Sequence, residues 1–309
     1  MKVQLLSSQQ IDPQKWDRFV RSSPQGAVYH EYGTLSALCT SWSALLISDG
    51  DWKAVFPFER KRKYFIRYSF PTMFTQFLGP VIALDSQDES TELSRLLAKR
   101  FRTMGRSLVA NFSPRYEFDR AWGNAGFKVE ERVTHWLSLD RSFEDIQKAY
   151  SENIRRNIKK GKKRFEIKVN ELDVKAAVDL FREEVGASLA ISETQYAGFI
   201  KWIGSLQDED RATIYSAKTQ DGTCAGFAII VHSGTHRIYS MGALRAEWRN
   251  SGLSPLLLSS AIGDAIDDGA AIFDFEGSMV EGIARFFKSF GSEKVIYNTV
   301  SLKKFPFGS

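Results

Sequence analysis

Residues 273–278 read Phe-Asp-Phe-Glu-Gly-Ser, and residues 282–291 read Gly-Ile-Ala-Arg-Phe-Phe-Lys-Ser-Phe-Gly. The first segment predicts an apolar strand that ends in two carboxylates and a Gly-Ser turn, and the second predicts a short helix that carries Lys288 among phenylalanines. Residues two apart on an extended strand point to one face, so we expect Asp274 and Glu276 on the same side, roughly 6–7 Å apart. Charged groups at the end of a buried strand favour a functional site over simple packing.

The rest of the chain predicts a series of secondary-structure elements that occurs twice, once in each half. The first series comprises strand 3–6, helices 13–20 and 31–38, strands 43–48 and 52–60, extended segment 74–82, helix 89–104, strand 107–112, short helix 118–124 and strand 129–139. The second comprises strand 166–169, helices 174–187 and 194–206, strands 212–218, 224–232 and 236–241, helix 255–268, strand 272–275, a short helix around 287 and strand 295–302. We therefore predict an α/β protein with two tandem domains, whose mixed sheets are flanked by helices.

The length and composition agree with this organisation. A chain of 309 residues exceeds the usual single core, and 43% hydrophobic with 26% charged residues is typical of a globular protein. Residues 142–145 resemble a capping box that opens a new helix, so we place the first domain at 1–141 and the second at 142–295. No segment of 60–80 residues carries heptads, which excludes a long coiled-coil arm.

Several function classes are disfavoured by composition. No apolar run reaches the roughly 20 residues needed to cross a bilayer, and the first residues lack a signal-peptide pattern, so we expect a cytoplasmic protein without a transmembrane segment. The two cysteines, Cys39 and Cys224, lie far apart and are expected to be reduced thiols. Four scattered histidines, His30 and His135 among them, have no ligand-like spacing, so we expect no metal site.

A basic segment follows the expected domain boundary. Residues 155–164 contain seven cations and no acid, while Ile154 and Ile158 share one face of a helix. A solvated helix face is the usual explanation of such a run, but no interleaved acids are available to pair with these charges. An anionic partner is the alternative, with phosphate contacts expected from Arg155, Arg156, Lys159 and Lys160. A second basic cluster consists of Arg60, Lys61, Arg62, Lys63 and Arg67.

A second candidate anion site lies at the start of the apolar helix 255–268. The preceding loop ends in Gly252, Leu253 and Ser254, with proline in the first turn, so free backbone N–H groups are expected at a positive helix end. Together with Arg249, these residues are our candidates for binding an anionic donor. An ordinary capped helix is the alternative explanation.

These segments together resemble the Fem family of nonribosomal peptidyltransferases, which use a doubled GNAT (N-acyltransferase) fold. Residues 273–291 are similar to the C-terminal signature of the family, residues 151–163 to its basic segment with an Asn-x-Arg pattern, and residues 74–80 to its Gly-Pro strand end, with Leu78 where arginine is often found. The loop Arg249-x-x-Gly252-x-Ser254 also resembles the GNAT pyrophosphate loop Gln/Arg-x-x-Gly-x-Gly/Ala, from which it departs at Ser254. The resemblance extends from residues 29–38 to Gly291.

The resemblance implies where the two substrates would bind. The second domain would receive the acyl donor, the cleft between the domains would receive the amine acceptor, and residues 296–309 would complete the first domain. By the same resemblance, Lys288 and Phe287 would lie at the centre of acyl transfer.

Direct transfer needs positioning, a deprotonated amine and a group that stabilises negative charge. Lys288 is the candidate for that charge stabilisation, Asp274 or Glu276 for the proton acceptor, and Tyr239 for the proton donor. Each has a simpler alternative: Lys288 as a surface lysine, the two acids as ion-pair partners of Arg285 or Lys288, and Tyr239 as a core tyrosine.

We therefore expect an enzyme that forms an amide by attack of an acceptor amine on an activated acyl group. The resemblance implies an aminoacyl-tRNA donor and a cell-wall (peptidoglycan) precursor as acceptor, either a phosphorylated small molecule or a lipid-linked one reached by peripheral membrane contact. No tightly bound cofactor is expected. Two alternatives remain: an acyl-CoA-dependent N-acyltransferase, and a non-catalytic binder of RNA or polyanions.

Overall fold

The computed structural model describes residues 1–83, 87–277 and 280–303. The chain forms two compact units, one built from Met1–Arg132 together with the chain from Ile296 onward, the other from Val133–Val295. The sequence had placed this division at 141/142; the units separate within one long strand, β8 (Lys128–Ser138). Residue 278, assigned to the turn after Glu276, lies outside the described residues, as do residues 304–309.

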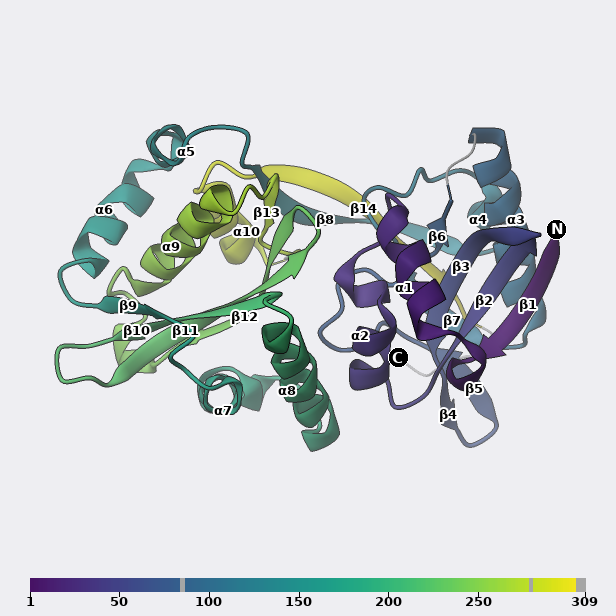
Figure 1. Cartoon of the computed structure of the whole chain (residues 1–309), viewed down its shortest axis with the longest axis horizontal. Helices are drawn as coiled ribbons and strands as arrows, with labels where there is room; N and C mark the ends of the chain where they lie inside the picture. The colour runs from purple at the N-terminus through teal and green to yellow at the C-terminus, as the bar shows by residue number, and fades with distance from the viewer. Residues whose placement is uncertain (84–86, 278–279, 304–309) are drawn as a thin grey trace. The chain divides into compact units, whose positions relative to one another are not determined.

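The first unit consists of the elements up to β8 and the end of the last strand (Figure 1). Its strands are β1 (Lys2–Ser7), β2 (Trp42–Asp49), β3 (Asp51–Glu59), β4 (Lys61–Lys63), β5 (Ile66–Ser69), β6 (Val81–Ile82), β7 (Ser107–Asn111) and parts of β8 and β14 (Glu293–Leu302). Its helices are α1 (Pro13–Ser22), α2 (Tyr32–Leu38), α3 (Gln87–Thr103) and α4 (Ala121–Asn124).

The sheet β1-β2-β3-β6 of this unit is covered on both faces. Ala44 and Leu46 of β2 pack with residues of α1 and α2, whereas Leu45 and Ile47 pack with residues of α3. Because side chains alternate along a strand, a strand between two helical layers is apolar on both faces, which explains the unbroken apolar run in β2. A second set of strands in the unit has the order β4-β5-β7-β14-β8.

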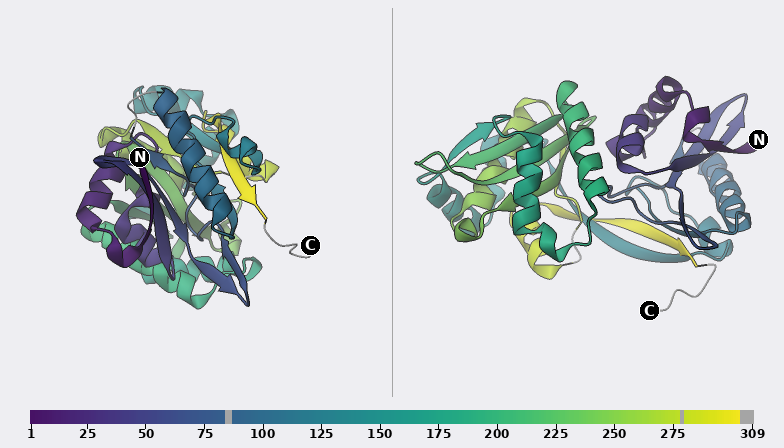
Figure 2. Two further views of the ribbon diagram at one scale, coloured as in Figure 1. Left: turned by 90° about the vertical axis from the view of Figure 1, so that its right-hand side faces the viewer. Right: turned by 90° about the horizontal axis from the view of Figure 1, so that it is seen from below.

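The second unit contains a sheet with the order β8-β13-β12-β11-β10-β9, in which only β12 and β13 run parallel among the registered pairs. Its further strands are β9 (Glu166–Val169), β10 (Ala212–Lys218), β11 (Cys224–Ser233), β12 (His236–Leu244) and β13 (Ile272–Asp274). Its helices are α5 (Phe143–Ala149), α6 (Glu152–Gly161), α7 (Val174–Glu184), α8 (Glu193–Asp208), α9 (Leu253–Asp267) and α10 (Glu281–Lys288). Helices α7 and α8 lie on one face of the sheet, and α9 lies on the other (Figures 1 and 2).

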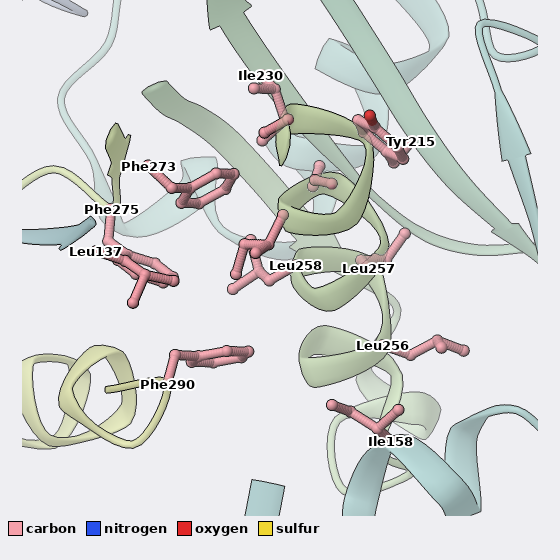
Figure 3. Close-up of a cluster of buried hydrophobic side chains, with 14 of the residues drawn as sticks. Leu137, Ile158, Tyr215, Ile230, Leu256, Leu257, Leu258, Phe273, Phe275 and Phe290 are labelled. Atoms are coloured by element: carbon pink, nitrogen blue, oxygen red, sulfur yellow. The ribbon is translucent and has the colours of Figure 1, made fainter. Parts of the chain in front are cut away.

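The core of the second unit forms around α9. Leu256, Leu257 and Leu258 project from successive positions of this helix into a cluster that also holds Phe273 and Phe290 (Figure 3). Helix α9 is therefore buried on most of its circumference, which explains its nearly uniform apolar sequence. Its position is thus fixed by packing, and so is the loop that precedes it.

Helix α6 packs against the start of α9 through two glycines. A Cβ on Gly161 would lie 2.7 Å from the carbonyl oxygen of Gly252, and a Cβ on Gly252 would lie 2.2 Å from the carbonyl oxygen of Asn157. Gly252 also has a φ of 88°, a conformation that L side chains rarely adopt. Only residues without a side chain allow this approach of the two backbones.

The structure differs from three sequence expectations. Residues 61–69 form the hairpin β4–β5, which the sequence did not predict because its cations obscure the strand pattern. Segment 74–82 is a strand only at β6, because Phe74 has a φ of 66° and Leu78 donates its N–H to the Asn111 carbonyl instead of pairing in a strand. Strand β13 ends at Asp274, one residue earlier than expected.

We expect Gly161→Ala to lower the free energy of unfolding by about 1–3 kcal/mol, because the added methyl group forces α6 away from the Gly252 carbonyl. The matched control is Gly204→Ala inside α8, where a Cβ meets nothing within 4 Å. That substitution should leave stability unchanged or raise it by up to about 1 kcal/mol, since alanine favours helix. Equal effects of the two substitutions in urea unfolding would contradict the close packing described above.

Candidate active site

A local irregularity in β12 opens the sheet of the second unit. Ile229 of β11 pairs with Met241, but the next residue, Ile230, pairs with Tyr239, so Ser240 is an extra residue on β12. Such a bulge bends its strand and disturbs the ladder. The pairing of β12 with β13 also stops at Ile238 in the described residues. Beyond this point β12 continues without β13 beside it.

A pocket of about 290 Å³ lies beside the bulge. It is lined by residues of β11, β12, the loop before α9 and α9 itself, with Val185 after α7: Val185, Phe227, Ala228, Tyr239, Gly242, Ala243, Leu244, Arg249, Ser254, Leu257 and Leu258. Three of the predicted site residues, Tyr239, Arg249 and Ser254, therefore meet around one hollow.

The start of α9 supplies hydrogen-bond donors next to this pocket. Gly252 is the N-cap residue and offers no side-chain cap, and Pro255 has no N–H. The backbone N–H groups of Leu253 and Ser254 have no acceptor among the described residues, as expected in the first turn of a helix. The predicted anion site is thus a helix end whose donors are available to a ligand.

The basic helix α6 adjoins the same loop. Lys160 donates from Nζ to the backbone carbonyl of Asn250 at 2.8 Å, and Arg156 bonds to Asn153 at 3.1 Å. None of the seven cations in residues 155–164 forms an ion pair with an acid in the described part of the chain. The charges of α6 therefore remain uncompensated beside the start of α9.

A second pocket, of about 480 Å³, lies on α6 itself. Its lining is Gln147, Tyr150, Arg155, Ile158, Lys159, Lys162 and Lys163. The ring of Tyr150 is 2% exposed, and its buried hydroxyl has no partner that meets hydrogen-bond geometry, although Ser259 lies near enough to lower the phenol pKa. Burial is the larger effect and raises that pKa to about 12, so the hydroxyl remains a neutral donor.

Arg249 is already engaged by an acid. Its Nη2 lies 3.2 Å from both the backbone carbonyl and the carboxylate of Glu184, at the end of α7. Its side chain is 57% exposed, so this ion pair is screened by solvent and contributes little stability. The pair nevertheless offsets the arginine's charge, and an anion at the loop would depend more on backbone donors and α6.

Asp274 and Glu276 differ sharply in environment, contrary to the expectation that they share one strand face. Asp274 is 2% exposed, and its Oδ1 accepts hydrogen bonds from Thr134 Oγ1 at 2.9 Å and from the Glu276 N–H at 2.8 Å. Glu276 lies past the end of β13 with a φ of 59° and is half-buried. The carboxylate of Asp274 thus fixes the turn that carries Glu276.

The electrostatics of Asp274 follow from its burial. Desolvation raises its pKa to about 6, while the bonds from Thr134 and from the Glu276 N–H oppose this increase. The indole N–H of Trp136 also lowers the pKa, but it does not reach hydrogen-bond geometry. Asp274 is therefore an acid held partly protonated near neutral pH, and its hydrogen bonds point to a structural role.

Tyr239 and Phe287 pack together at the edge of the first pocket. The Phe287 ring stacks on Phe275 at 5.0 Å and meets the Tyr239 ring edge-on at 6.4 Å. Burial first, and then the charge of Glu276, raise the pKa of Tyr239 to about 12, even though the side chain is only half-buried by accessible surface. Its phenol is thus protonated at neutral pH and is available to donate. Phe287 is 6% exposed, and its ring packs between those of Phe275 and Tyr239.

Lys288 is exposed at the C-terminal end of α10, directly after Phe287. It forms no ion pair among the described residues, whereas Arg285 is paired with Glu281 at 2.6 Å. Its charge, after burial, lowers the pKa of His135. The structure therefore does not pair Lys288 or Arg285 with Asp274, which was the alternative explanation of that acid.

Several residues around this site had no signal in the sequence. Thr134 lies 140 positions from Asp274, and neither the bulge at Ser240 nor the Glu184 partner of Arg249 follows a local motif. No group of three or more potential metal ligands occurs in the ranges that the structure covers. In the same ranges, no helix combines the length and hydropathy required of a membrane span.

Comparisons with known proteins agree with this fold. Residues 148–288 match the family described as acetyltransferase (GNAT) domain. The structure titled "Crystal structure of FemX" is 14% identical with a TM-score of 0.69, covering 96% of this chain and 97% of that one. A lysylphosphatidylglycerol synthetase (L-PGS) structure from Bacillus licheniformis and a tandem GNAT protein of the clavulanic acid pathway follow, at 12% and 11% identity.

The last two structures have TM-scores of 0.60 and 0.59; they cover 96% and 99% of this chain, and this chain covers 93% and 100% of theirs. Curated proteins gave no match in sequence. The predicted class, a mixed α/β chain of two tandem GNAT-like domains, is confirmed, and so is its resemblance in fold to FemX.

We expect the Asp274 environment to be visible in the pH dependence of stability. The folded state holds the Asp274 proton more tightly than the unfolded state, so the Asp274 contribution to the free energy of unfolding should fall as the pH rises from about 4 through about 6, by up to about 3 kcal/mol. His30 and His232, whose pKa burial lowers to about 4, contribute a slope of opposite sign in the same range, in wild type and variant alike. Asp274→Asn keeps an acceptor for both hydrogen bonds and removes only the Asp274 contribution, so the difference between wild type and this variant, measured by urea unfolding between pH 4 and 8, should show the fall. Asp274→Ala should instead be destabilised by about 2–4 kcal/mol, because Thr134 and the Glu276 N–H lose their acceptor. An unchanged slope in the asparagine variant would refute this account.

Proposed function

We propose that this chain, an acyltransferase whose residues 148–288 match the acetyltransferase (GNAT) domain family, transfers an aminoacyl group from an aminoacyl-tRNA to an amine of a phosphorylated cell-wall precursor. The observation that carries the choice of donor is helix α6, whose cations have no acidic partner in the described part of the chain and adjoin the start of α9. The resemblance of the basic segment and of residues 273–291 to the Fem family supports the same choice. Such a donor implies work in the cytoplasm.

The charge on α6 suits a nucleic acid better than a single pyrophosphate. Its four cations, Arg155, Arg156, Lys159 and Lys160, span six residues, about 9 Å of helix, and three more follow directly at residues 162–164, so the segment would contact several phosphates in sequence. Coenzyme A would instead depend on the loop before α9, where Arg249 is offset by Glu184. The pocket between Tyr239 and Ser254 is then the expected site of the aminoacyl end.

The chemistry requires one bond to form and one to break. The acceptor nitrogen attacks the ester carbonyl carbon and loses a proton, and the carbon–oxygen bond to the terminal ribose breaks as that oxygen gains a proton. Glu276, close enough to raise the Tyr239 pKa, is our candidate for receiving the amine proton. The protonated phenol of Tyr239 is our candidate for donating a proton to the leaving ribose oxygen. Asp274 acts as a positioning residue, because it holds the Glu276 turn.

Negative charge develops on the carbonyl oxygen during this attack and needs fixed donors. We assign that role to backbone N–H groups of β12 beyond Ile238, where pairing with β13 has ended. Lys288 would stabilise the leaving oxygen from the end of α10, one residue after the Phe287 ring that packs on Tyr239.

The alternative donor, acyl-CoA, is favoured by the unpaired N–H groups at the start of α9. Thermal shift separates the two: stabilisation by acetyl-CoA and not by an aminoacyl-tRNA would overturn our proposal. A non-catalytic polyanion binder would show neither transfer nor any dependence on Lys288.

Lys288→Met should fold as wild type, because the side chain is exposed and unpaired in the described residues. We expect kcat for aminoacyl transfer to fall about 10²–10³-fold, the cost of losing one stabiliser of developing charge. The control is Lys294→Met on β14, which removes an equally exposed cation near His135 and should retain activity. Loss of less than threefold in the Lys288 variant, measured by single-turnover kinetics with radiolabelled aminoacyl-tRNA, would remove Lys288 from the mechanism.

Neutralising Arg155 and Lys159 with glutamine should weaken tRNA binding about tenfold or more while sparing kcat. Because two phosphate contacts are removed, the negative slope of log affinity against log salt concentration should become shallower by about 1.8. The matched control is Lys175→Gln with Lys201→Gln, exposed cations on α7 and α8. If both double variants bind alike in filter-binding titrations, α6 does not hold the donor.

A further inference from the structure

The hairpin β4–β5 of the first unit carries two aromatic side chains at its tip. Lys63 pairs with Ile66, which leaves Tyr64 and Phe65 as the connecting residues. Tyr64 is 81% exposed and Phe65 91% exposed, the highest values among the exposed large hydrophobic side chains of the described residues. Figure 1 shows this hairpin projecting from the body of its unit.

Local structure does not account for this choice of residues. Tyr64 has a φ of 53°, and two-residue turns with positive φ favour asparagine and glycine over aromatic residues. The tip is held in place by Arg62, whose Nε donates to the Tyr64 carbonyl at 2.7 Å. An unfavourable turn thus keeps two large apolar groups in water.

Cations surround the hairpin behind its tip. Lys61 pairs with Glu59 at 2.8 Å, but the side chains of Arg60, Lys63 and Arg67 have no acidic partner in the described residues. Beneath them, burial lowers the pKa of Arg106, and the charges of Arg67 and Arg60 lower it further. The hairpin is therefore a positively charged projection with little compensation.

Protection of the sheet edge explains the cations of the hairpin but not its exposed aromatic tip. Lysines on an edge strand such as β4 discourage pairing with another chain. Exposed aromatic groups have the opposite effect, so the tip needs another explanation. Phe70 and Met73, 38% and 37% exposed, extend the apolar surface near β5.

We propose that the β4–β5 hairpin docks the protein on an anionic phospholipid bilayer, with Tyr64 and Phe65 entering the interface and Lys63, Arg67 and Arg60 contacting the headgroups. The aromatic side chains at the tip and the cations behind them follow the order of the bilayer, in which the apolar interior lies below the charged headgroups. At about 3.4 Å per residue, the Arg62–Arg67 pair lies about 7 Å behind the tip, comparable to the 5–10 Å depth of interfacial insertion. Aromatic residues favour this interface, and cations gain from anionic lipids.

This surface extends the proposed function without depending on it, since it concerns where the enzyme works and not what it transfers. An RNA ligand is the competing partner. Stacking on bases needs aromatic rings within a basic groove, whereas here the rings lie ahead of the cations at the outermost point. The geometry therefore favours the bilayer.

The test is flotation of the full chain with vesicles of phosphatidylcholine, alone or with about 30 mol% phosphatidylglycerol. Wild type should float with the anionic vesicles and remain unbound with the neutral ones. Tyr64→Ser with Phe65→Ser, and separately Lys63→Gln with Arg67→Gln, should each lower the partition coefficient by about tenfold or more. Circular dichroism and melting temperature establish that each variant is folded.

Matched control variants remove exposed apolar or cationic side chains that lie outside the hairpin. Val169→Ser with Leu189→Ser removes two other exposed apolar groups, and Lys99→Gln with Arg100→Gln removes two exposed cations of α3. Both should bind vesicles as wild type does. Transfer from soluble substrates should be unchanged in the hairpin variants, which separates this proposal from that for the catalytic site.

Three outcomes overturn the proposal. The first is the absence of wild-type binding to anionic vesicles. The second is equal loss of binding in hairpin and control variants. The third is a hairpin variant that keeps vesicle binding but loses affinity for a single-stranded RNA oligonucleotide, which would make the hairpin an RNA contact.

Discussion

The contact between Gly161 and Gly252 is the constraint on which the site of the second unit depends. It lets two backbones approach where any side chain would collide, and so brings a helix of uncompensated cations against the open end of another helix. The N-cap conformation of Gly252, with its positive φ, simultaneously sets the start of α9. Packing of α9 in the core then fixes both features relative to the pocket.

The site divides its acids between two tasks. Asp274 is buried and its oxygen is used to hold a turn, whereas Glu276 is half-buried close to the Tyr239 phenol. In the proposed mechanism, that phenol, with its high pKa, supplies a proton, and the exposed ammonium of Lys288 stabilises negative charge. In the proposed reaction the acyl donor is already activated, so the protein needs to supply only positioning, proton transfer and stabilisation of negative charge.

Local signals allowed much of the fold to be predicted. Asp12 caps α1 by accepting from the Lys15 N–H, Ser142 caps α5 in the same way, and the turn after Asp49 joins β2 to β3, so these elements lie close to the expected positions. The hairpin β4–β5 was missed because cations and a turn of two aromatic residues follow no common strand or turn pattern. Strand β5 also pairs in parallel with β7, about 40 residues later in the chain, and such long-range pairing leaves no signal in the local sequence.

The sequence indicated candidate residues for the site but not how the structure arranges them. Arg249, Ser254 and Tyr239 were identified from loop and strand patterns, and they line one pocket. Their partners are distant in sequence: Glu184 for Arg249, and Thr134 for Asp274. A strand that ends one residue early, followed by a residue with positive φ, also reversed the expected alignment of the two acids.

The pairing of β14 with β7 has a consequence for synthesis of the chain. Residues 299–302 supply a strand partner for residues 108–111, so the sheet of the first unit stays incomplete until residues 299–302 have left the ribosome. The second unit, by contrast, is continuous from Val133 to Val295. All residues of the second unit are therefore synthesised before the first unit can complete its sheet, whereas amino-terminal domains usually mature first during translation.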